Sequence, residues 1–593
     1  MKKRVADIIM ETLVEKGITD CFAVVGGGAM YLDHALALNN ELHKYFNHHE
    51  QACAMAAEAY ARVSGRMAAV CVTSGPGATN AITGVMGAWQ DSLPMLVLSG
   101  QVRYEISVEK SGLSLRYRGI QEFEIINSVK NMTKYAKMVT DPLDILYELE
   151  KAIYMAREGR QGPAWLDIPQ DIQSAVVDAE SLRRFTPPEE EKGLAEKDFQ
   201  FILKKLRGAE RPCILAGNGV ANSGNIDAFR KLADVLKIPV IAAAIAADVM
   251  YREHPFYYGL SGSIGPRPGN FIVQNADVIM VLGCSMGFKM TGFAQEYFAP
   301  KATVMAIDID ENEMKKPGVR ISHFFKSDLT RFFEEAEQYM TESVEVSQTW
   351  LQYCDHLRER FSPFAPGENL AADERVCSYY FWSRYDRYEP EDNVSILGNN
   401  TASSAKLQIG IKKEKQRIIA NNNCGSMGAD LPESIGAAVA MKRPVVCLTG
   451  DGSIMMNLQE LQTIRHYGLQ VKIVVFSNDG YNAIRQTAKN FFDGLCIGCT
   501  AETGISFPDF KSVAETFGFS YRHCKCNGQV DECLEWLFLS EEAVFLEIDQ
   551  KLDDPVLPKV MTRVLEDGSY ATPALQDMYP FLDKEEYERL MFW

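Results

Sequence analysis

Long apolar runs are missing from this chain of 593 residues. A helix that crosses a bilayer needs about 20 consecutive apolar residues, and the sequence contains no such run. The first residues, MKKRVADIIMETLVEKGI, alternate apolar and charged side chains at helical spacing and lack the apolar core of a signal peptide. We therefore expect no membrane segment and a cytoplasmic location.

Positive charge is the second shortage. Lysine and arginine number 61 against 79 aspartates and glutamates, which leaves a net charge of −18. Such an acidic surface repels phosphate backbones, so we expect no nucleic acid partner. Hydrophobic residues make up 47%, a normal share for a globular protein, and the length suffices for three or four domains with large cores.

The 14 cysteines do not follow the pattern of a zinc ribbon, which usually repeats CxxC. Here CIGC (Cys496, Cys499) is followed by CKC (Cys524, Cys526). Many of the other cysteines lie inside apolar runs, as expected for buried thiols in a reducing cytosol. Zinc at these four cysteines is kept as an alternative to plain, unligated thiols.

What the chain does contain is three blocks in which apolar, β-rich runs alternate with helical patterns. This alternation predicts parallel sheets covered by helices. A Pro- and Glu-rich linker, SLRRFTPPEEEKGLAEKD, separates the first two blocks, and turn signals at Asp567-Gly568 mark a C-terminal tail. We expect an α/β fold of three doubly wound parallel-sheet domains, at residues 1–176, 195–345 and 366–553, with the tail at 554–593.

The sharpest chemical signal is in the third block. The stretch VVCLTGDGSIMMNLQELQTI predicts a buried strand, the turn Gly450-Asp451-Gly452-Ser453 and a helix. Glycines let a backbone approach a ligand closely, and a helix N-terminus favours phosphate. Asp451 offers a hard oxygen ligand for a divalent cation.

A second strand, VKIVVFSNDGYN, follows that helix and ends at Asn478-Asp479-Gly480. A strand-helix-strand unit of this kind places the two strand ends side by side. Asp451, the Asn478 amide and a backbone carbonyl are then able to hold one cation against a diphosphate. Asp-Gly and Asn-Asp-Gly are also common turn sequences, so either motif alone would be weak evidence.

The pair of motifs resembles the metal-diphosphate motif of thiamine diphosphate enzymes. Further stretches closely resemble acetolactate synthase and its relatives, in order and over nearly the whole chain: EQACAMAAEAYARVSGRMAAVCVTSGPGATNAITGVMGAWQDSLPMLVLSGQV, GPAWLDIPQDIQ and GSMGADLPESIGAAVA. The resemblance implies a pyrimidine-binding, a central and a diphosphate-binding domain, with thiamine diphosphate and Mg²⁺ as cofactors. It also implies a homo-oligomer, a dimer or a tetramer, because the family builds each site from two chains.

The resemblance assigns roles to residues of the third block. Asp451, Asn478 and the Gly480 carbonyl would hold Mg²⁺. Met427 in CGSMG would wedge the cofactor into its bent shape, a role that suits an apolar and adaptable side chain. The other cofactor-binding positions that the resemblance implies are Gly398, Asn399, Asn400, Gly425, Gly450, Gly452 and Ser453.

In the first block, NHHEQ contains Glu50, which matches the family's glutamate that hydrogen-bonds N1′ of the aminopyrimidine and favours its imino tautomer. That role needs a carboxylic acid in a water-poor place. A metal site would need further ligands, because His48 and His49 are adjacent and point apart; a solvated helix start is the other alternative. His49 matches a family histidine and is a candidate catalytic residue, whereas His48 replaces an arginine and has no assigned role.

The family decarboxylates a 2-keto acid, commonly pyruvate, with the cofactor as electron sink. Gln121 in RGIQEFEII matches a glutamine that acetolactate synthases place near the acceptor. We therefore expect carboligation, the transfer of the acyl-anion equivalent to a second carbonyl compound, with Gly27 and Gln121 lining the substrate pocket. The alternatives are a non-oxidative 2-keto acid decarboxylase and a non-catalytic relative, and the intact Glu50, Asp451 and Asn478 argue against the latter.

Departures from the family's pattern indicate a larger acceptor. Gln170 replaces the lysine of DIPKD, which removes a positive charge. Ala483 and Thr487 replace the methionine and tryptophan of GMVRQW, and Ile120 replaces a phenylalanine, which removes bulk on the acceptor side. A keto-sugar would suit the space. If neighbouring loops refill it, the protein is an ordinary acetolactate synthase with pyruvate as acceptor.

FAD is not expected. Housekeeping acetolactate synthases carry it in the central domain, with GARFDDRVTG among its contacts. This chain has GCSMGFKMTG, in which Ser285 and Lys289 replace the two arginines that would grip the flavin. The segment RQTAKNFFDGLCIGCTAETGISFPDF matches a loop that closes over the site in the family.

Overall fold

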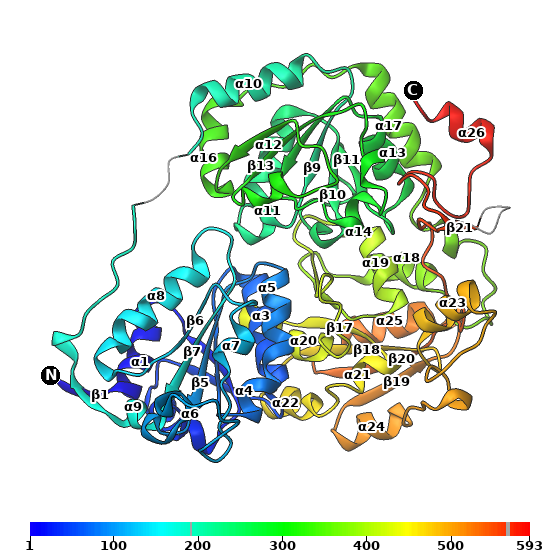
Figure 1. Ribbon diagram of the computed structural model, residues 1–593. Helices are drawn as coiled ribbons and strands as arrows, with labels where there is room; N and C mark the ends of the chain where they lie inside the picture. The colour runs from blue at the N-terminus through cyan, green and yellow to red at the C-terminus, as the bar shows by residue number, and fades with distance from the viewer. Residues whose placement is uncertain (190–192, 565–569, 593) are drawn as a thin grey trace.

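The computed structural model of the protein describes residues 1–189, 193–564 and 570–592 and contains three α/β units, each with a six-stranded sheet (Figure 1). Every pairing within these sheets is parallel, so the predicted fold of three doubly wound parallel sheets is confirmed. Residues 190–192 of the predicted linker and the turn predicted at Asp567-Gly568 lie outside the described residues. Among the described helices, none is both long and apolar enough to cross a membrane.

The first sheet has the strand order β3-β2-β4-β5-β7-β6. Its inner strands are buried at every position because helices cover both faces, which explains their continuous apolar runs. Helices α1, α2 and α8 pack on one face and α3 and α5 on the other. The elements are β2 (Asp20–Ala23), β3 (His43–Phe46), β4 (Ala69–Val72), β5 (Met95–Gln101), β6 (Tyr135–Met138), β7 (Pro163–Pro169), α1 (Val5–Glu15), α2 (Met30–Leu38), α3 (Glu50–Ser64), α5 (Ile82–Gln90) and α8 (Ile145–Arg157).

The second sheet, green in Figure 1, has the order β11-β10-β9-β12-β13-β14. The strand order reverses between β9 and β12, and ligands of open parallel sheets bind in the crevice at such a reversal. Its elements are β9 (Pro212–Ala216), β10 (Val240–Ala243), β11 (Tyr257–Ser261), β12 (Val278–Leu282), β13 (Thr303–Asp308), β14 (His323–Lys326), α10 (Glu196–Arg207), α12 (Ile226–Leu236), α13 (Arg267–Asn275), α16 (Leu329–Tyr339) and α17 (Gln348–Arg360).

The third sheet has the order β16-β15-β17-β18-β20-β19, so the carboxyl ends of β15, β17 and β18 are neighbours. The two strands that carry the predicted metal motifs, β17 and β18, pair directly. The elements are β15 (Val394–Leu397), β16 (Arg417–Ala420), β17 (Val445–Gly450), β18 (Val471–Ser477), β19 (Ser520–Cys524), β20 (Val544–Asp549), α18 (Ser378–Tyr388), α19 (Thr401–Ile409), α20 (Asp430–Met441), α22 (Glu460–His466) and α25 (Val530–Leu539).

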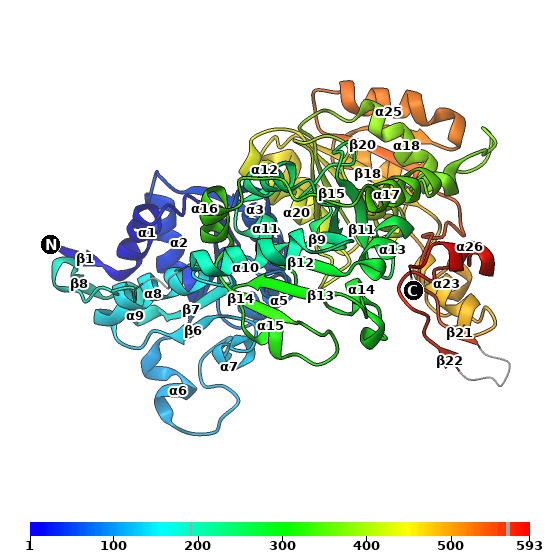
Figure 2. The same ribbon diagram turned by 90° about the horizontal axis from the view of Figure 1, so that it is seen from above.

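Helices α3 and α20 pack against each other and join the first unit to the third; they lie side by side in Figures 1 and 2. Small residues bring the two backbones close. A Cβ added to Gly436 of α20 would lie 1.9 Å from the carbonyl oxygen of Ala56 of α3. One continuous hydrophobic core contains buried side chains of both units.

Charged groups are enclosed at this contact. Arg62 donates to Glu58 (2.7 Å) and to Asp91 (2.5 Å), and the Asn421 amide donates to Glu58 (3.1 Å). Both carboxylate oxygens of Glu433 are buried and have no hydrogen-bond partner among the described residues. Burial raises the pKa of Glu58 to about 7 and the pKa of Glu433 well above its ordinary value. Burial therefore favours the uncharged form of Glu433.

The C-terminal residues return to the second unit, and α26 (Lys584–Arg589) lies beside α13 and α17 in Figure 1. Buried amides of α13 hold this tail. The Asn270 side chain donates to the Leu575 carbonyl (3.0 Å), and the Asn275 side chain donates to the Leu590 carbonyl (2.9 Å). The tail therefore completes the hydrogen bonding of a helix in the second unit.

Replacing Gly436 with alanine should destabilise the protein, because the new methyl group would collide with the α3 backbone at Ala56. We expect this overpacking to lower the free energy of unfolding by about 1–3 kcal/mol, measured by urea unfolding followed by circular dichroism. Gly287→Ala is the matched control, since a Cβ there meets no atom within 4 Å. Equal unfolding midpoints for the two variants would contradict close packing at this position.

Candidate active site

The carboxyl edge of the third sheet carries a group of polar side chains around Asp451. β17 ends at Gly450, and Asp451 begins the short helix α21 (Asp451–Ile454). Its buried carboxylate accepts hydrogen bonds from the backbone N–H groups of Gly452 (2.8 Å), Asn478 (2.9 Å) and Gly480 (3.2 Å). Burial raises the pKa of Asp451 to about 6, and these hydrogen bonds oppose the rise. The structure thus brings Asp451 and Asn478 together at adjacent strand ends.

Asn478 is held by two residues that sequence reasoning missed. Its Nδ2 donates to Gln550 Oε1 (2.9 Å), which leaves the amide oxygen as the atom available to a cation. The Arg485 guanidinium lies at that oxygen (3.2 Å) and at the Asn478 carbonyl (2.9 Å). Gln550 follows β20 at the same sheet edge, so the argument from strand ends, applied to AVFLEIDQ, would have found it.

The donor set fits a hard divalent cation. A carboxylate, an amide oxygen and backbone carbonyls are the ligands that such cations prefer, and the guanidinium at Asn478 shows that these oxygens attract positive charge. Two glycines let neighbouring groups pack closely against this edge. A Cβ on Gly452 would lie 2.2 Å from the Tyr481 ring, and a Cβ on Gly480 would lie 2.0 Å from the Cys499 carbonyl oxygen.

The predicted diphosphate loop follows β15, the neighbour of β17. A Cβ on Gly398 would lie 2.0 Å from Asp430 Oδ2, so this position requires glycine. Asn399 donates to the Gly425 carbonyl (2.6 Å), and the Asn400 side chain caps the N-terminus of α19 (2.8 Å). A helix N-terminus and a glycine-bearing turn are thus adjacent, which is the arrangement that binds phosphate groups.

Met427 lies in the loop between β16 and α20. Its Cε would be 3.4 Å from a Cβ on Gly452, so Met427 reaches the GDG turn. Ser453 joins this loop to the turn: its hydroxyl accepts from the Gly428 N–H (2.9 Å) and donates to Asp430 (2.7 Å). All the predicted cofactor-binding residues of the third block therefore surround one sheet edge.

Glu50 is the first residue of α3 and is half-buried. Its Oε2 accepts a hydrogen bond from the Asn80 amide (3.0 Å). Its Oε1 lies 3.4 Å from the position of a Cβ on Gly77, so the glycine leaves this oxygen uncovered. Among the described residues, Oε2 of Glu50 therefore has a hydrogen-bond partner and Oε1 has none.

The residues around Glu50 have structural partners. His49 is the N-cap of α3, and its Nδ1 accepts from the Gln51 N–H (3.1 Å), so that nitrogen is unprotonated. The Asn47 side chain (2.9 Å) and the His48 backbone N–H (3.0 Å) donate to Glu460 of α22. The exposed His48 side chain is not part of this anchoring.

The predicted substrate-pocket residues of the first unit lie at the carboxyl edge of its sheet. Gln170 follows β7 and donates to the Gly27 carbonyl (2.6 Å). Gln121 is exposed, has a φ of +59°, and its carbonyl oxygen would be 2.3 Å from a Cβ on Gly75. The remaining two, Ala483 and Thr487, are exposed on α23 (Asn482–Phe491) in the third unit.

The candidate residues form two groups, one around Glu50 in the first unit and one around Asp451 in the third. The Asn457 side chain lies between the units: it donates to the side chain of Gln51, the residue after Glu50 (3.0 Å), and to the Gly428 carbonyl (2.8 Å). Among the described residues, no hydrogen bond joins Glu50 itself to Asp451 or to its partners.

A cavity of about 200 Å³ lies in the crevice of the second sheet, at the carboxyl ends of β9 and β12. Its lining includes Gly217, Gly283, Ser285 and Lys289. Lys289 donates to the Asn422 carbonyl, and Ser285 carries no charge. These residues do not reproduce the two-arginine grip on a flavin.

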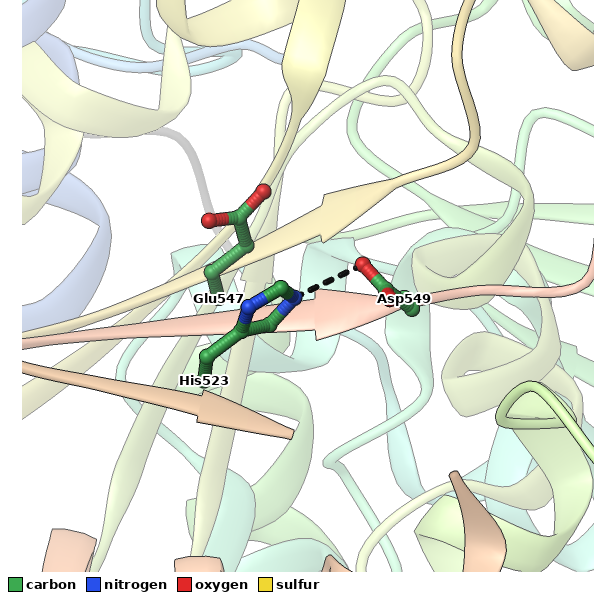
Figure 3. A group of neighbouring side chains, drawn as sticks. All are labelled: His523, Glu547 and Asp549. Atoms are coloured by element: carbon green, nitrogen blue, oxygen red, sulfur yellow. Dashed lines mark hydrogen bonds and ion pairs between the residues drawn. The ribbon is translucent and has the colours of Figure 1, made fainter. Parts of the chain in front are cut away.

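A second cluster of ligand-type side chains lies on β19 and β20 (Figure 3). Among the described residues, His523, Glu547 and Asp549 are the one group of three or more His, Cys, Asp or Glu whose ligand atoms lie within 4.8 Å of one another. His523 and Asp549 are 2.8 Å apart, Tyr521 donates to Glu547 (2.5 Å), and Arg375 lies 3.8 Å from Asp549. These partners satisfy one another, and the cysteines of CIGC and CKC are not in the group.

Comparison with known families matches three regions of the chain. They are "Thiamine pyrophosphate enzyme, N-terminal TPP binding domain" at residues 3–123, "central domain" at 199–328 and "C-terminal TPP binding domain" at 397–548. The three matches describe one family in its domain order and together span more than half of the chain.

Similar proteins cover almost the whole chain. The acetolactate synthase isozyme 2 large subunit of Escherichia coli K12 is 29% identical, over 92% of this chain and 95% of the relative. The acetolactate synthase large subunit of Lactococcus lactis is 25% identical, over 94% of each. A probable acetolactate synthase large subunit of Methanocaldococcus jannaschii is 29% identical, over 92% of this chain and 91% of the relative.

Asp451→Asn should abolish tight, Mg²⁺-dependent binding of thiamine diphosphate, because it removes the negative charge while keeping the size of the side chain. We expect the dissociation constant to rise by at least about 100-fold, measured by calorimetry at fixed Mg²⁺. Asp479→Asn is the matched control, since this neighbouring side chain is 66% exposed and pairs with Arg375. Similar losses in both variants would contradict the assignment of Asp451.

Proposed function

Because the chain belongs to the thiamine pyrophosphate enzyme family, we propose that it joins a 2-keto acid, in the first instance pyruvate, to a carbonyl acceptor larger than pyruvate. Its three domain matches and its similarity to acetolactate synthases make it an acetolactate synthase-like enzyme that depends on thiamine diphosphate. Our proposal adds the metal, the roles of individual residues, the acceptor, the assembly and a cytoplasmic location.

Bound thiamine diphosphate supplies an electron sink for the carbon that loses CO₂. In this chain Asp451, Asn478 and the Gly480 carbonyl would hold Mg²⁺, since they converge at one buried edge. The N-terminus of α19, which follows the loop 398–400, and the glycines of the GDG turn would accommodate the diphosphate, and Met427 would support the bend of the cofactor. Gln550 orients the Asn478 amide for this role.

Glu50 would hold and return one proton through Oε1. Asn80 fixes the other carboxylate oxygen, and Gly77 leaves Oε1 uncovered. His49 would cap α3 through Nδ1 and so fix the position of Glu50, which leaves Nε2 as the ring nitrogen for the catalytic role expected from the sequence.

The partners of Glu50 and of Asp451 lie in different units, which supports an active site built from two copies of the chain. Glu50 is bonded within the first unit and Asp451 within the third. We therefore propose a homodimer as the smallest active form, with a tetramer as an assembly of two dimers.

A larger acceptor is supported by one observation on α23. Ala483 and Thr487 lie one turn apart on its exposed side, and the Thr487 hydroxyl donates a hydrogen bond to the Ala483 carbonyl (3.0 Å). Small side chains thus stand where the family carries bulk. Ile120, beside Gln121, is 89% exposed and does not fold back over this space.

Gln170 supports the same conclusion through its chemistry. Its Nε2 donates a hydrogen bond to the Gly27 carbonyl, so its amide oxygen is the atom that can accept a hydrogen bond from a substrate. A neutral acceptor oxygen suits the hydroxyl groups of a keto-sugar better than the lysine of the family would. FAD has no part in the proposal.

The second candidate is an acetolactate synthase in the strict sense, with pyruvate as acceptor, and the names of the relatives favour it. Incubation of the enzyme with Mg²⁺, thiamine diphosphate and ¹³C-pyruvate alone separates the two. Rapid, saturable formation of acetolactate would overturn the larger acceptor, whereas a labelled product seen only with a keto-sugar present would support it.

Glu50→Gln should lower the rate of pyruvate turnover by about 10²–10⁴-fold, the usual contribution of a positioned acid or base. The amide keeps the shape and the contact with Asn80 but cannot exchange the proton. Binding of thiamine diphosphate, followed by circular dichroism, should be nearly unchanged. Glu41→Gln, an exposed glutamate of the same unit, serves as the control; full activity of Glu50→Gln would exclude the proposed role.

Refilling α23 with Ala483→Met and Thr487→Trp together should shift the acceptor preference toward pyruvate. We expect the rate with a keto-sugar acceptor to fall about 10-fold or more, because the added bulk occupies its space, while acetolactate formation rises. Product masses from ¹³C-pyruvate report both rates. Lys489→Trp adds bulk to the same helix at an exposed position on another side and should leave the preference unchanged.

A further inference from the structure

The CIGC stretch lies beside the Asp451 site and has no part in the proposed function. Gly498, between the two cysteines, has a φ of +61° and turns the backbone back on itself. Thr503 fixes the turn: its carbonyl accepts from the Gly498 N–H (2.9 Å) and its hydroxyl from the Cys499 N–H (3.0 Å). The turn directs Cys496 and Cys499 toward each other, and the neighbouring Cys499 thiol raises the pKa of Cys496.

Cys499 is built into the wall of the metal site. Its side chain is fully buried, and its carbonyl accepts from the Tyr481 N–H (2.9 Å). The same carbonyl oxygen would be 2.0 Å from a Cβ on Gly480, whose own carbonyl is a proposed metal ligand. Any change in the shape of the turn is therefore transmitted to Gly480.

Arg485 connects the other thiol to the same site. Its positive charge favours the thiolate of Cys496, opposing the effect of the hydrogen bond from the partner thiol. Its guanidinium also donates to the side chain and the carbonyl of Asn478. The pKa of Cys496 is raised on balance, so reaction there depends on access to the half-buried thiol rather than on a low pKa.

Solvent access to Cys496 distinguishes this pair from the pair Cys524 and Cys533. Cys496 is half-buried, and its neighbours Leu495 and Ile497 are 81% and 86% exposed. Cys524 and Cys533 also form a hydrogen-bonded pair, but both are buried in the third unit. A solute therefore reaches Cys496 without unfolding the protein and does not reach the Cys524–Cys533 pair.

We propose that Cys496 and Cys499 form a dithiol modification site that reacts with small-molecule disulfides and closes to a disulfide beside the metal site. The Cys496 thiolate attacks one sulfur of the reagent and displaces one reagent thiol. The Cys499 thiolate then attacks the Cys496 sulfur of the mixed disulfide and displaces the second. Two protein thiols are oxidised, one reagent disulfide is reduced to two thiols, and these take up the two protons.

Closing the bond pulls the two sulfurs to covalent distance and moves the Cys499 carbonyl against Gly480. We expect the affinity for a divalent cation to fall about 10-fold, as for other changes just outside a metal's ligand set. This consequence depends on the proposed metal site, whereas the modification itself does not.

The test uses the full-length protein, first reduced and then equilibrated with mixtures of oxidised and reduced glutathione. After alkylation and trypsin digestion, peptide 490–511 contains both cysteines and no other. As the mixture becomes more oxidising, we expect the doubly alkylated peptide to give way to an unalkylated peptide two hydrogen atoms lighter than the free dithiol, while Cys524 and Cys533 stay reduced. Cys499→Ser should instead accumulate a glutathione adduct at Cys496, and Cys496→Ser should remain unmodified.

A reduced peptide 490–511 at every glutathione ratio, or a stable mixed disulfide in the unaltered protein, would overturn the proposal. Mn²⁺ titration of the reduced and oxidised forms, followed by electron paramagnetic resonance, tests the coupling. Equal Mn²⁺ affinities of the two forms would overturn the link to Gly480. Absence of Mn²⁺ binding in both forms would overturn the proposed metal site, while the peptide masses still decide the modification.

Discussion

The contact between α3 and α20 is the constraint on which the rest of the arrangement depends. Each helix begins at a carboxylate beside one group of candidate site residues. Glu50 begins α3, and Asp430, which accepts from Ser453 of the GDG turn, begins α20. Because Gly436 lets the two backbones approach, the position of one helix start sets that of the other. Burying Arg62 with several acids is costly in energy, and the raised pKa of Glu433 favours its uncharged form, which reduces that cost.

Much of the fold and of the metal edge follows from the sequence because their signals are local. Runs of apolar residues predict the parallel strands, and polar residues directly after them predict Asp451 and Asn478 at one edge. The partners that position these residues come from distant segments: Gln550 for Asn478 and Asn80 for Glu50. They depend on which strands and helices become neighbours, and spacing along the chain does not contain that information. His49 illustrates the same limit, since its N-cap hydrogen bond appears only once the start of α3 is known.

Residues that match the family's pattern and residues that depart from it differ in exposure. Asp451 and Asn478 are buried and tied to several backbone groups, so a substitution there disturbs many contacts at once. Ile120, Ala483 and Thr487 are exposed and carry few contacts. The proposed roles follow the same division: the metal ligands are assigned to rigid strand ends, and acceptor choice is assigned to positions that tolerate change.

The hold of α13 on the C-terminal residues has a consequence for synthesis. The side chains of Asn270, Gln274 and Asn275 are buried and donate to Leu575, Gln576 and Leu590, respectively. On the ribosome, α13 emerges long before those partners exist. Until residues 575–590 have been synthesised, these side-chain amides hydrogen-bond to water. The second unit therefore completes its core only after that segment has been added.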